Sequence, residues 1–326
     1  MKKVLGLGNA LVDILIRMDN DRYLDEFELP RGSMILVDDV KAKHIQENTI
    51  HLKKDIVCGG SASNTISGIA NLGGSCGYIG KVGTDEYGEI FRKDLEQLHV
   101  KPYLLRCNTK TGIASTLISQ DGERTFGTFL GAAVEISSED LVSEHFVDYD
   151  YLHIEGYLIV NHELMTRALI LARENGLKVS IDMASYNVVE ANLEYLKPII
   201  EEYVDILFAN EEESKALTGK EPEESLNEIA EVVDIAIVKT GGSGSLVSTK
   251  GKVYEVPPIQ AICLDTTGAG DLYAAGFLYG LTNNLTPEKC GKLGSLLGGN
   301  VIQVYGARMD EDHWDKILEE VRHIIG

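Results

Sequence analysis

The sequence predicts an α/β fold: a mainly parallel sheet with helices on both faces, and a small separate β sheet that acts as a lid. From about residue 59 onward, apolar runs typical of buried strands alternate with segments of helical spacing, as in parallel sheets. Two segments, about 14–50 and 102–131, interrupt this alternation with strand-like patterns. We therefore expect a single domain over residues 1–326, a lid built from those two segments, and ligands at the carboxyl ends of the parallel strands.

The first half of the chain mixes strands with two clear helices. Residues 61–72 carry apolar side chains at helical spacing and stop at a glycine pair, and residues 87–98 place their apolar side chains on one face. Most of 17–50 is irregular and charged. The expected elements are strands at 4–8, 11–16 and 34–37, a helix at 61–72, a strand end at 78–80, a helix at 87–98 and strands within 102–131.

In the second half, strands and helices follow one another closely. Each expected strand is a short apolar run, and each expected helix repeats apolar residues every three or four positions. The expected strands are 151–154, 178–182, 205–208, 235–239, 245–248 and 253–256. The expected helices are 162–175, 189–203, 210–218, 224–232, 286–304 and 310–325, with one more that has Asp271 in its first turn.

Composition and charge exclude several classes of function. The 326 residues are 44% hydrophobic and 25% charged, as in ordinary globular proteins, and no segment is long and apolar enough to span a membrane. A net charge of −21 argues against nucleic acid as a partner, because binding phosphates takes clustered Lys and Arg. The start of the chain does not fit a secretory leader. The five scattered cysteines include no C-x-x-C pair, so we expect reduced thiols, no zinc site and a cytoplasmic protein.

Well-known phosphate and catalytic motifs are missing from the sequence. The P-loop pattern G-x-x-x-x-G-K-[ST] does not occur, because Gly80-Lys81 and Gly219-Lys220 are followed by Val and Glu. Gly6-Leu7-Gly8 begins a dinucleotide fingerprint, but Leu11 stands where its third glycine belongs. H-E-x-x-H and a strand-to-helix G-x-S-x-G are also absent. Any phosphate chemistry must therefore use a different scaffold.

The stretch 264–277 carries the clearest chemical signal. A strand-like lead-in ends in two threonines, then Gly268, Ala269 and Gly270, and small residues at helical spacing follow. Glycines let backbone N–H groups converge, and the start of a helix adds partial positive charge, so this turn suits an anion. Asp271 is then either a helix cap or a general base that takes the proton of a nucleophile attacking the bound anion.

A second glycine-to-helix junction and a strand aspartate offer groups to another ligand. Gly59 and Gly60 let a ligand approach closely, and Asn64 offers a donor and an acceptor to a hydroxyl-rich substrate. The same residues also suit an ordinary helix cap. Asp13 lies on an otherwise apolar strand and needs a partner, which two hydroxyls of a polyol or a lysine would supply.

Three further features have both a structural and a functional interpretation. Asn210 and Glu213 match a capping box, but Glu213 could also order magnesium and its waters. The turn at 239–244 is either a hairpin loop or the cradle of a nucleotide. Arg124 is either solvated or closes over the site with the lid and neutralises a transferring phosphoryl group.

Together these stretches resemble the PfkB, or ribokinase-like, family of small-molecule kinases. The resemblance rests on Gly-Gly-Ser-Ala-Ser-Asn at 59–64, on Asp-Thr-Thr-Gly-Ala-Gly-Asp at 265–271 and on Asn210-x-x-Glu213, and it covers essentially the whole chain. It implies a ribokinase-like three-layer sandwich that transfers the γ-phosphoryl of ATP to a hydroxymethyl group. Residues 8–38 look closest to the adenosine kinase branch, whereas Asp182-Met183-Ala184 departs from the Asp-x-Asn usual in sugar kinases.

The resemblance also implies roles for single residues. Asp271 would be the general base, beside an anion hole to which Arg124 adds positive charge. The anion hole would comprise Gly268, Ala269 and Gly270, and the substrate hydroxyls would be held by Asp13, Gly59, Gly60 and Asn64. ATP would lie beside Asn210, Thr240, Gly242, Gly244, Thr267 and Asn300. Magnesium would be ordered through water by Glu213, and potassium would lie at Asp265 and Thr267.

The expected substrate is a nucleoside such as adenosine, with its base enclosed by lid residues among Leu15, Leu36, Phe126 and Phe129. A sugar of the ribose or fructose type is the alternative, and it would require a smaller and more polar lid pocket. A nucleotide-binding module without turnover is the third interpretation. The protein is expected to be a monomer or a homodimer paired through the lid.

Overall fold

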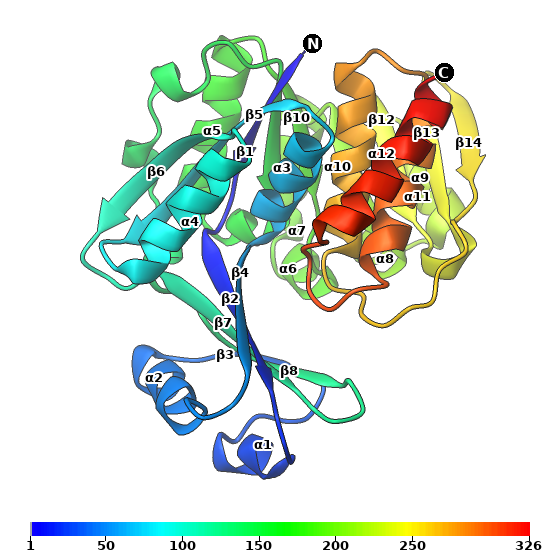
Figure 1. The fold of residues 1–326 in the computed structure, drawn as a ribbon. Coiled ribbons are helices and arrows are strands. Elements are labelled where there is room, and N and C mark those ends of the chain that lie inside the picture. Colours follow the sequence, from blue (N-terminus) through cyan, green and yellow to red (C-terminus); the bar gives the residue numbers. More distant parts are fainter. Residues whose placement is uncertain (1) are drawn as a thin grey trace.

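The computed structural model describes residues 2–326, which form a large sheet flanked by helices and a smaller sheet below it (Figure 1). The large sheet has the order β14-β13-β12-β11-β10-β9-β1-β5-β6, and the small sheet has the order β3-β8-β7-β2-β4. All pairs of the large sheet from β6 to β12 are parallel, and β13 and β14 add an antiparallel hairpin. The strands of the large sheet are β1 (Lys3–Leu7), β5 (Ser75–Gly83), β6 (Lys101–Cys107), β9 (Tyr151–Glu155), β10 (Lys178–Asp182), β11 (Ile206–Asn210), β12 (Ile235–Lys239), β13 (Ser245–Thr249) and β14 (Lys252–Val256).

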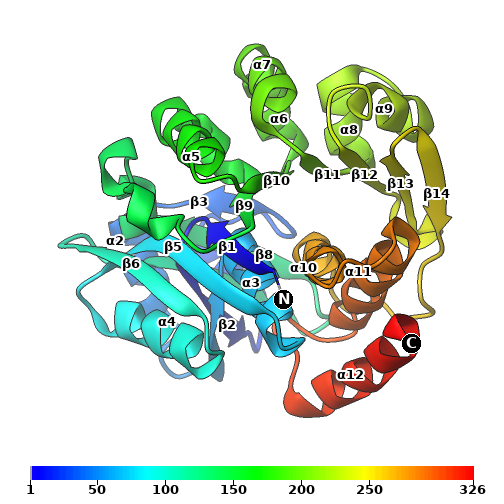
Figure 2. The same cartoon turned by 90° about the horizontal axis from the view of Figure 1, so that it is seen from above.

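Helices cover both faces of the large sheet, which confirms the predicted three-layer α/β class (Figure 2). One face carries α5 (His162–Glu174), α6 (Tyr186–Ala191), α7 (Leu193–Tyr203), α8 (Glu211–Thr218) and α9 (Pro222–Ile229). The other carries α3 (Ser61–Asn71), α4 (Glu86–Gln97), α10 (Ala269–Thr282), α11 (Pro287–Val301) and α12 (Glu311–Ile325). Successive residues of one strand enter opposite cores: Phe208 packs in the α10 core and Leu207 in the α5–α9 core. This explains why the strands are apolar throughout rather than alternating.

A helix covers one face of the small sheet, and the other face is exposed mainly at its β3 edge. Its strands are β2 (Leu11–Arg17), β3 (Met34–Leu36), β4 (Lys54–Gly59), β7 (Gly112–Ile118) and β8 (Arg124–Phe129), and α1 (Arg22–Glu26) and α2 (Asp39–Asn48) accompany them. Helix α2 packs on the face that carries Ile14 and Gly127, and Gln46 of α2 donates a hydrogen bond to Ser115 Oγ there. The opposite face carries Asp13 and Phe126, with Leu15 and Thr116 buried and Met34 and Leu36 exposed at its edge.

The predicted extent of the small sheet is wrong in two places. Residues 101–107, expected in the lid, form the parallel edge strand β6 of the large sheet. An edge strand is half exposed, so its alternation looks like that of a lid strand. Conversely, β4 joins the small sheet although no strand was expected there, and the segment 17–50 contains α1 and α2. Helix α2 buries only Ala42 and Ile45, so its apolar periodicity is weak.

Other predicted boundaries need smaller corrections. The helix expected at 189–203 is two helices, α6 and α7, separated at Asn192. Short 3₁₀ turns join several elements: η1 (Gly131–Glu135), η2 (Ser138–Asp140), η3 (Ser143–His145), η4 (Gly156–Val160) and η5 (Gly241–Ser243). Within residues 2–326, none of the helices has the length and apolar character to cross a membrane. The five cysteines are free thiols, buried at Cys58, Cys76 and Cys290 and exposed at Cys263.

Candidate active site

The polar residues that close neighbouring parallel strands meet at one edge of the large sheet. Glu155 of β9 pairs in register with Asp182 of β10, and Asn210 of β11 pairs with Lys239 of β12. The carboxyl ends of parallel strands share an edge, and ligands bind there in open α/β sheets. The amino end of α10 reaches the same edge, because a Cβ on Gly270 would lie 2.9 Å from Lys239 Nζ. The glycine turn of 264–277 therefore lies at the carboxyl ends of the parallel strands, where ligands are expected to bind.

The backbone of this turn requires glycine at its centre. Gly268 has a φ of 76° and precedes the first residue of α10, Ala269. A Cβ on Gly268 would also lie 2.5 Å from the Cβ of Ala307, so both conformation and space exclude a side chain. The start of α10 presents backbone N–H groups and the positive end of the helix dipole toward the edge of the sheet. This geometry suits an anion.

Asp271 lies in the first turn of α10 and is held by two side chains of α3. Ser61 Oγ donates to Asp271 Oδ1 at 2.7 Å, and Asn64 Nδ2 donates to Asp271 Oδ2 at 2.9 Å. Burial raises the pKa of Asp271 to about 6, although the hydrogen bonds from Asn64 and Ser61 oppose the rise. Asp271 is therefore an oriented carboxylate at neutral pH, and each of its oxygens can accept a further hydrogen bond. Its pKa suits a general base.

Lys239 and Asp182 form a buried ion pair beside the anion turn, and neither was predicted from the sequence to act at the site. Lys239 Nζ lies 2.7 Å from Asp182 Oδ2. Burial works against the charge of Lys239, but Asp182 and Glu213 together hold its pKa above the usual value. The signal was present in the sequence, because both residues close predicted parallel strands and such ends share an edge.

Asn210 and Glu213 form the predicted capping box. Glu213 N donates to Asn210 Oδ1 at 2.8 Å, while Asn210 N and Nδ2 donate to the two carboxylate oxygens of Glu213 at 2.8 and 2.9 Å. Burial raises the pKa of Glu213 to about 7. Within residues 2–326 no group of three or more His, Cys, Asp or Glu side chains could hold a metal ion by itself.

Asp13 and the Gly59–Gly60 pair line the same region from the small sheet. A Cβ on Gly59 would lie 2.4 Å from Asp13 Oδ2, and one on Gly60, which has a φ of 93°, would lie 2.1 Å from Asn9 O. Burial raises the pKa of Asp13 to about 6 against the influence of Arg308 and Arg124. Burial is the largest cause of this rise, so hydrogen bonds donated by a ligand would stabilise the charged carboxylate. Its oxygens can therefore accept hydrogen bonds from a ligand.

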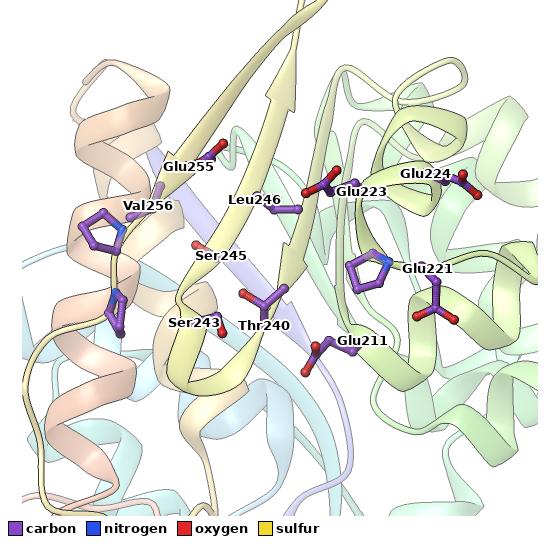
Figure 3. A pocket seen from close by; sticks show the side chains of 13 residues that line it. Glu211, Glu221, Glu223, Glu224, Thr240, Ser243, Ser245, Leu246, Glu255 and Val256 are labelled. Carbon is purple, nitrogen blue, oxygen red and sulfur yellow. The ribbon is translucent and has the colours of Figure 1, made fainter.

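Of the residues expected beside ATP, Thr240 of the 239–244 turn lines a cavity, whereas Asn300 does not. Thr240 lines a cavity of about 760 Å³ between the β13–β14 hairpin and helices α8 and α9, with several glutamates around it (Figure 3). Gly242 faces open space, and Gly244 packs its backbone against Val256 O. Asn300 lies on α11 and donates to Leu296 O of its own helix, so it has no visible tie to this cavity. The cavity and the 239–244 turn are adjacent, as a nucleotide cradle requires.

Arg124 and Thr267, predicted for separate tasks, lie in contact. Arg124 comes from the first position of β8, and its Nη1 donates to Thr267 Oγ1 at 2.9 Å. Its other terminal nitrogen makes an ion pair with Asp265, and its guanidinium lies 5.6 Å from the ring centre of Tyr305. The Asp265 carboxylate also accepts the backbone N–H of Thr267 and of Gly306. The small sheet is thus tied to the loop that precedes the anion turn.

The open face of the small sheet combines Asp13 with apolar side chains. In register, Leu15 lies opposite Thr116, Thr116 opposite Phe126, and Phe126 opposite Met34, so these residues share a face. Met34 is 53% exposed and Leu36, two positions on, is 60% exposed. Phe129 is an odd number of positions from Phe126 and lies on the opposite face, so it cannot line the same pocket.

Comparisons with known proteins agree with this geometry. Residues 33–314 match the family model described as pfkB family carbohydrate kinase. A solved structure of a probable sugar kinase from Rhizobium etli superimposes with a TM-score of 0.87 at 33% identity, covering 98% of both chains. The adenosine kinase of Sinorhizobium meliloti superimposes with a TM-score of 0.86 at 32% identity, covering 98% of this chain and 99% of the other. A nucleoside kinase of Methanocaldococcus jannaschii is 29% identical over 264 residues, which are 81% of this chain and 85% of the relative.

Proposed function

The chain belongs to the PfkB family of kinases, and on that premise we propose that it transfers the γ-phosphoryl of ATP to the 5′-hydroxyl of a nucleoside, with adenosine as the first candidate. The family and the kinase-named relatives support a phosphotransferase. The relatives include proteins named sugar kinase and proteins named adenosine kinase, so the nucleoside substrate is a proposal that rests on the site itself.

One observation carries the choice of a nucleoside. The open face of the small sheet places Asp13 beside Leu15 and Phe126, with Met34 and Leu36 exposed at its rim. A nucleoside has a ribose diol for a carboxylate and an apolar base that could cover the exposed Met34 and Leu36, whereas a bare sugar would leave these two side chains in water. A ligand that has both a diol and an apolar base therefore fits this face better than a bare sugar does.

The chain supplies the groups that proton transfer needs. Asp271 accepts the proton of the substrate hydroxyl, while Ser61 and Asn64 keep its carboxylate oriented. The small sheet would place the substrate by holding its hydroxyls at Asp13. A positioned general base contributes about 10²–10⁴-fold in rate.

Positive charge around the transferring group comes from several sources. The backbone of 268–270 and the start of α10 face the anion, and the ammonium of Lys239 lies against Gly270. Magnesium bound with ATP would neutralise phosphate charge, and Glu213 has lone pairs left to hold a water of that ion. No potassium is included at Asp265 and Thr267, because Arg124 already contacts both residues.

The deciding experiment measures ADP release with Mg-ATP over adenosine, inosine, guanosine, cytidine, ribose and fructose. Turnover that is at least tenfold more efficient with one nucleoside than with any sugar supports the proposal. Preference for a sugar would leave the roles of Asp271 and of the 268–270 turn unchanged. It would reject the proposal that the small sheet binds a nucleobase. Absence of turnover on the whole panel, with ATP still bound, would favour a nucleotide-binding module.

A further inference from the structure

The guanidinium of Arg124 contacts the two residues at which the family resemblance implies a potassium ion. The family resemblance implies potassium at Asp265 and Thr267, without specifying which of their atoms would bind it. In the structure, those two groups converge on Arg124: one terminal nitrogen pairs with Asp265, and the other donates to Thr267 Oγ1 at 2.9 Å. A cation is therefore already present between the two expected ligands, and it is part of the chain.

The oxygen atoms at this position are already occupied. Asp265 Oδ1 accepts the N–H of Thr267 at 3.0 Å, and Oδ2 accepts the N–H of Gly306 at 2.6 Å in addition to its ion pair with Arg124. An alkali ion requires several oxygens that replace its water shell. Here hydrogen-bond donors surround the carboxylate instead, so the residues do not fit potassium while Arg124 is in place.

We infer that Arg124 takes the place of a monovalent cation beside the anion turn, so that this protein neither binds nor requires potassium. The inference does not depend on which substrate the protein phosphorylates.

Burial explains why this position must hold a cation of some kind. The side chains of Arg124 and Asp265 are 7% and 5% exposed. A buried carboxylate without a counter-charge is strongly destabilising. Burial lowers the pKa of Arg124 to about 10, which still leaves it fully protonated at neutral pH. The face of Tyr305, 5.6 Å from the guanidinium, adds a further favourable contact for a cation.

Thermal unfolding in KCl and in choline chloride at equal ionic strength tests the inference without any substrate. The wild type is expected to unfold at the same temperature in both salts. Arg124→Ala removes the counter-charge of buried Asp265 and the donor to Thr267, so KCl is expected to raise its unfolding temperature by roughly 2–5 °C over choline chloride. If the variant turns over substrate, KCl should also restore part of the lost activity.

Arg31→Ala is the matched control. Arg31 also belongs to the part of the chain that carries the small sheet, but it pairs with the exposed Asp121 and does not touch Asp265. It should show no potassium response. Arg124→Gln provides a second variant if Arg124→Ala does not fold. A potassium response of the wild type would overturn the inference, and so would the lack of any response in both Arg124 variants. Because these readouts need no substrate, their failure is distinct from failure of the proposed nucleoside kinase activity.

Discussion

Asn64 Nδ2 donates a hydrogen bond of 2.9 Å to Asp271 Oδ2, and this bond joins two motifs that lie 207 positions apart in the chain. From the sequence, Asn64 is expected to hold the substrate hydroxyls and Asp271 to take the proton. In the structure, Asn64 also holds the Asp271 carboxylate in one orientation. The two tasks are compatible, because Asn64 Oδ1 is buried and has no hydrogen-bond partner among residues 2–326. It can therefore accept a hydroxyl while Nδ2 holds Asp271.

Asp271→Asn is expected to lower turnover by about 10²–10⁴-fold, because an amide cannot take the proton of the substrate hydroxyl. The amide has the same shape, and Ser61 can accept from its NH₂ group, so fold and ATP binding should persist. Steady-state kinetics and ATP titration measure the two properties. Turnover within threefold of the wild type would reject Asp271 as the base.

The pH dependence of kcat/KM should fall on the acid side with a midpoint near 6, because protonated Asp271 cannot act as a base. Asn64 and Ser61 stabilise the charged carboxylate, so they lower its pKa. Asn64→Ala is therefore expected to move the acid limb to higher pH. Asn71→Ala, on the same helix but bonded to Ser67 O, is the control and should leave the limb in place. An unmoved limb in Asn64→Ala would contradict the assignment.

Lys239→Met removes one partner of a buried ion pair and leaves Asp182 unpaired. We expect it to cost on the order of 3–5 kcal/mol in the free energy of unfolding. Lys239→Met combined with Asp182→Asn should recover much of that stability. Turnover of the double variant should nevertheless stay lower by roughly 10²–10³-fold, since the cation beside Gly270 is missing. Denaturant unfolding and kinetics separate the two effects, and full recovery of activity would mean a structural role only.

Glu213→Gln tests the predicted magnesium role. Glutamine can still accept the backbone N–H of Asn210, so the start of α8 should remain folded. Loss of the negative charge should raise the Mg²⁺ concentration needed for half-maximal activity about tenfold, because a neutral amide holds a metal-bound water less well. Activity titrated with Mg²⁺ at fixed ATP measures this shift. An unchanged Mg²⁺ requirement would leave Glu213 as a helix cap alone.

Phe126→Ala and Phe129→Ala separate the two faces of β8. Phe126 shares the open face with Asp13, so its truncation should raise KM for the nucleoside about 10–100-fold at constant kcat. Phe129 lies on the other face, and its truncation should lower stability and leave KM unchanged. The reverse pattern would show that the base does not bind the small sheet.

The sequence by itself determined the features that depend on neighbouring residues. Apolar spacing predicted most strands and helices, and the capping box of Asn210 and Glu213 follows from two residues three positions apart. The glycine turn ending in Asp271 is equally local: Gly268 adopts a positive φ at the start of a helix, as the motif suggests.

Only the tertiary structure decided which distant groups meet. The pairs Lys239–Asp182 and Arg124–Asp265 join residues that lie far apart in the chain, and their contact depends on strand order and on how the small sheet docks. The same reason explains the misplaced strand at 101–107, because alternation looks alike on any half-exposed strand and does not specify which sheet that strand joins. Local patterns encode elements and caps, whereas pairing is a property of the whole fold.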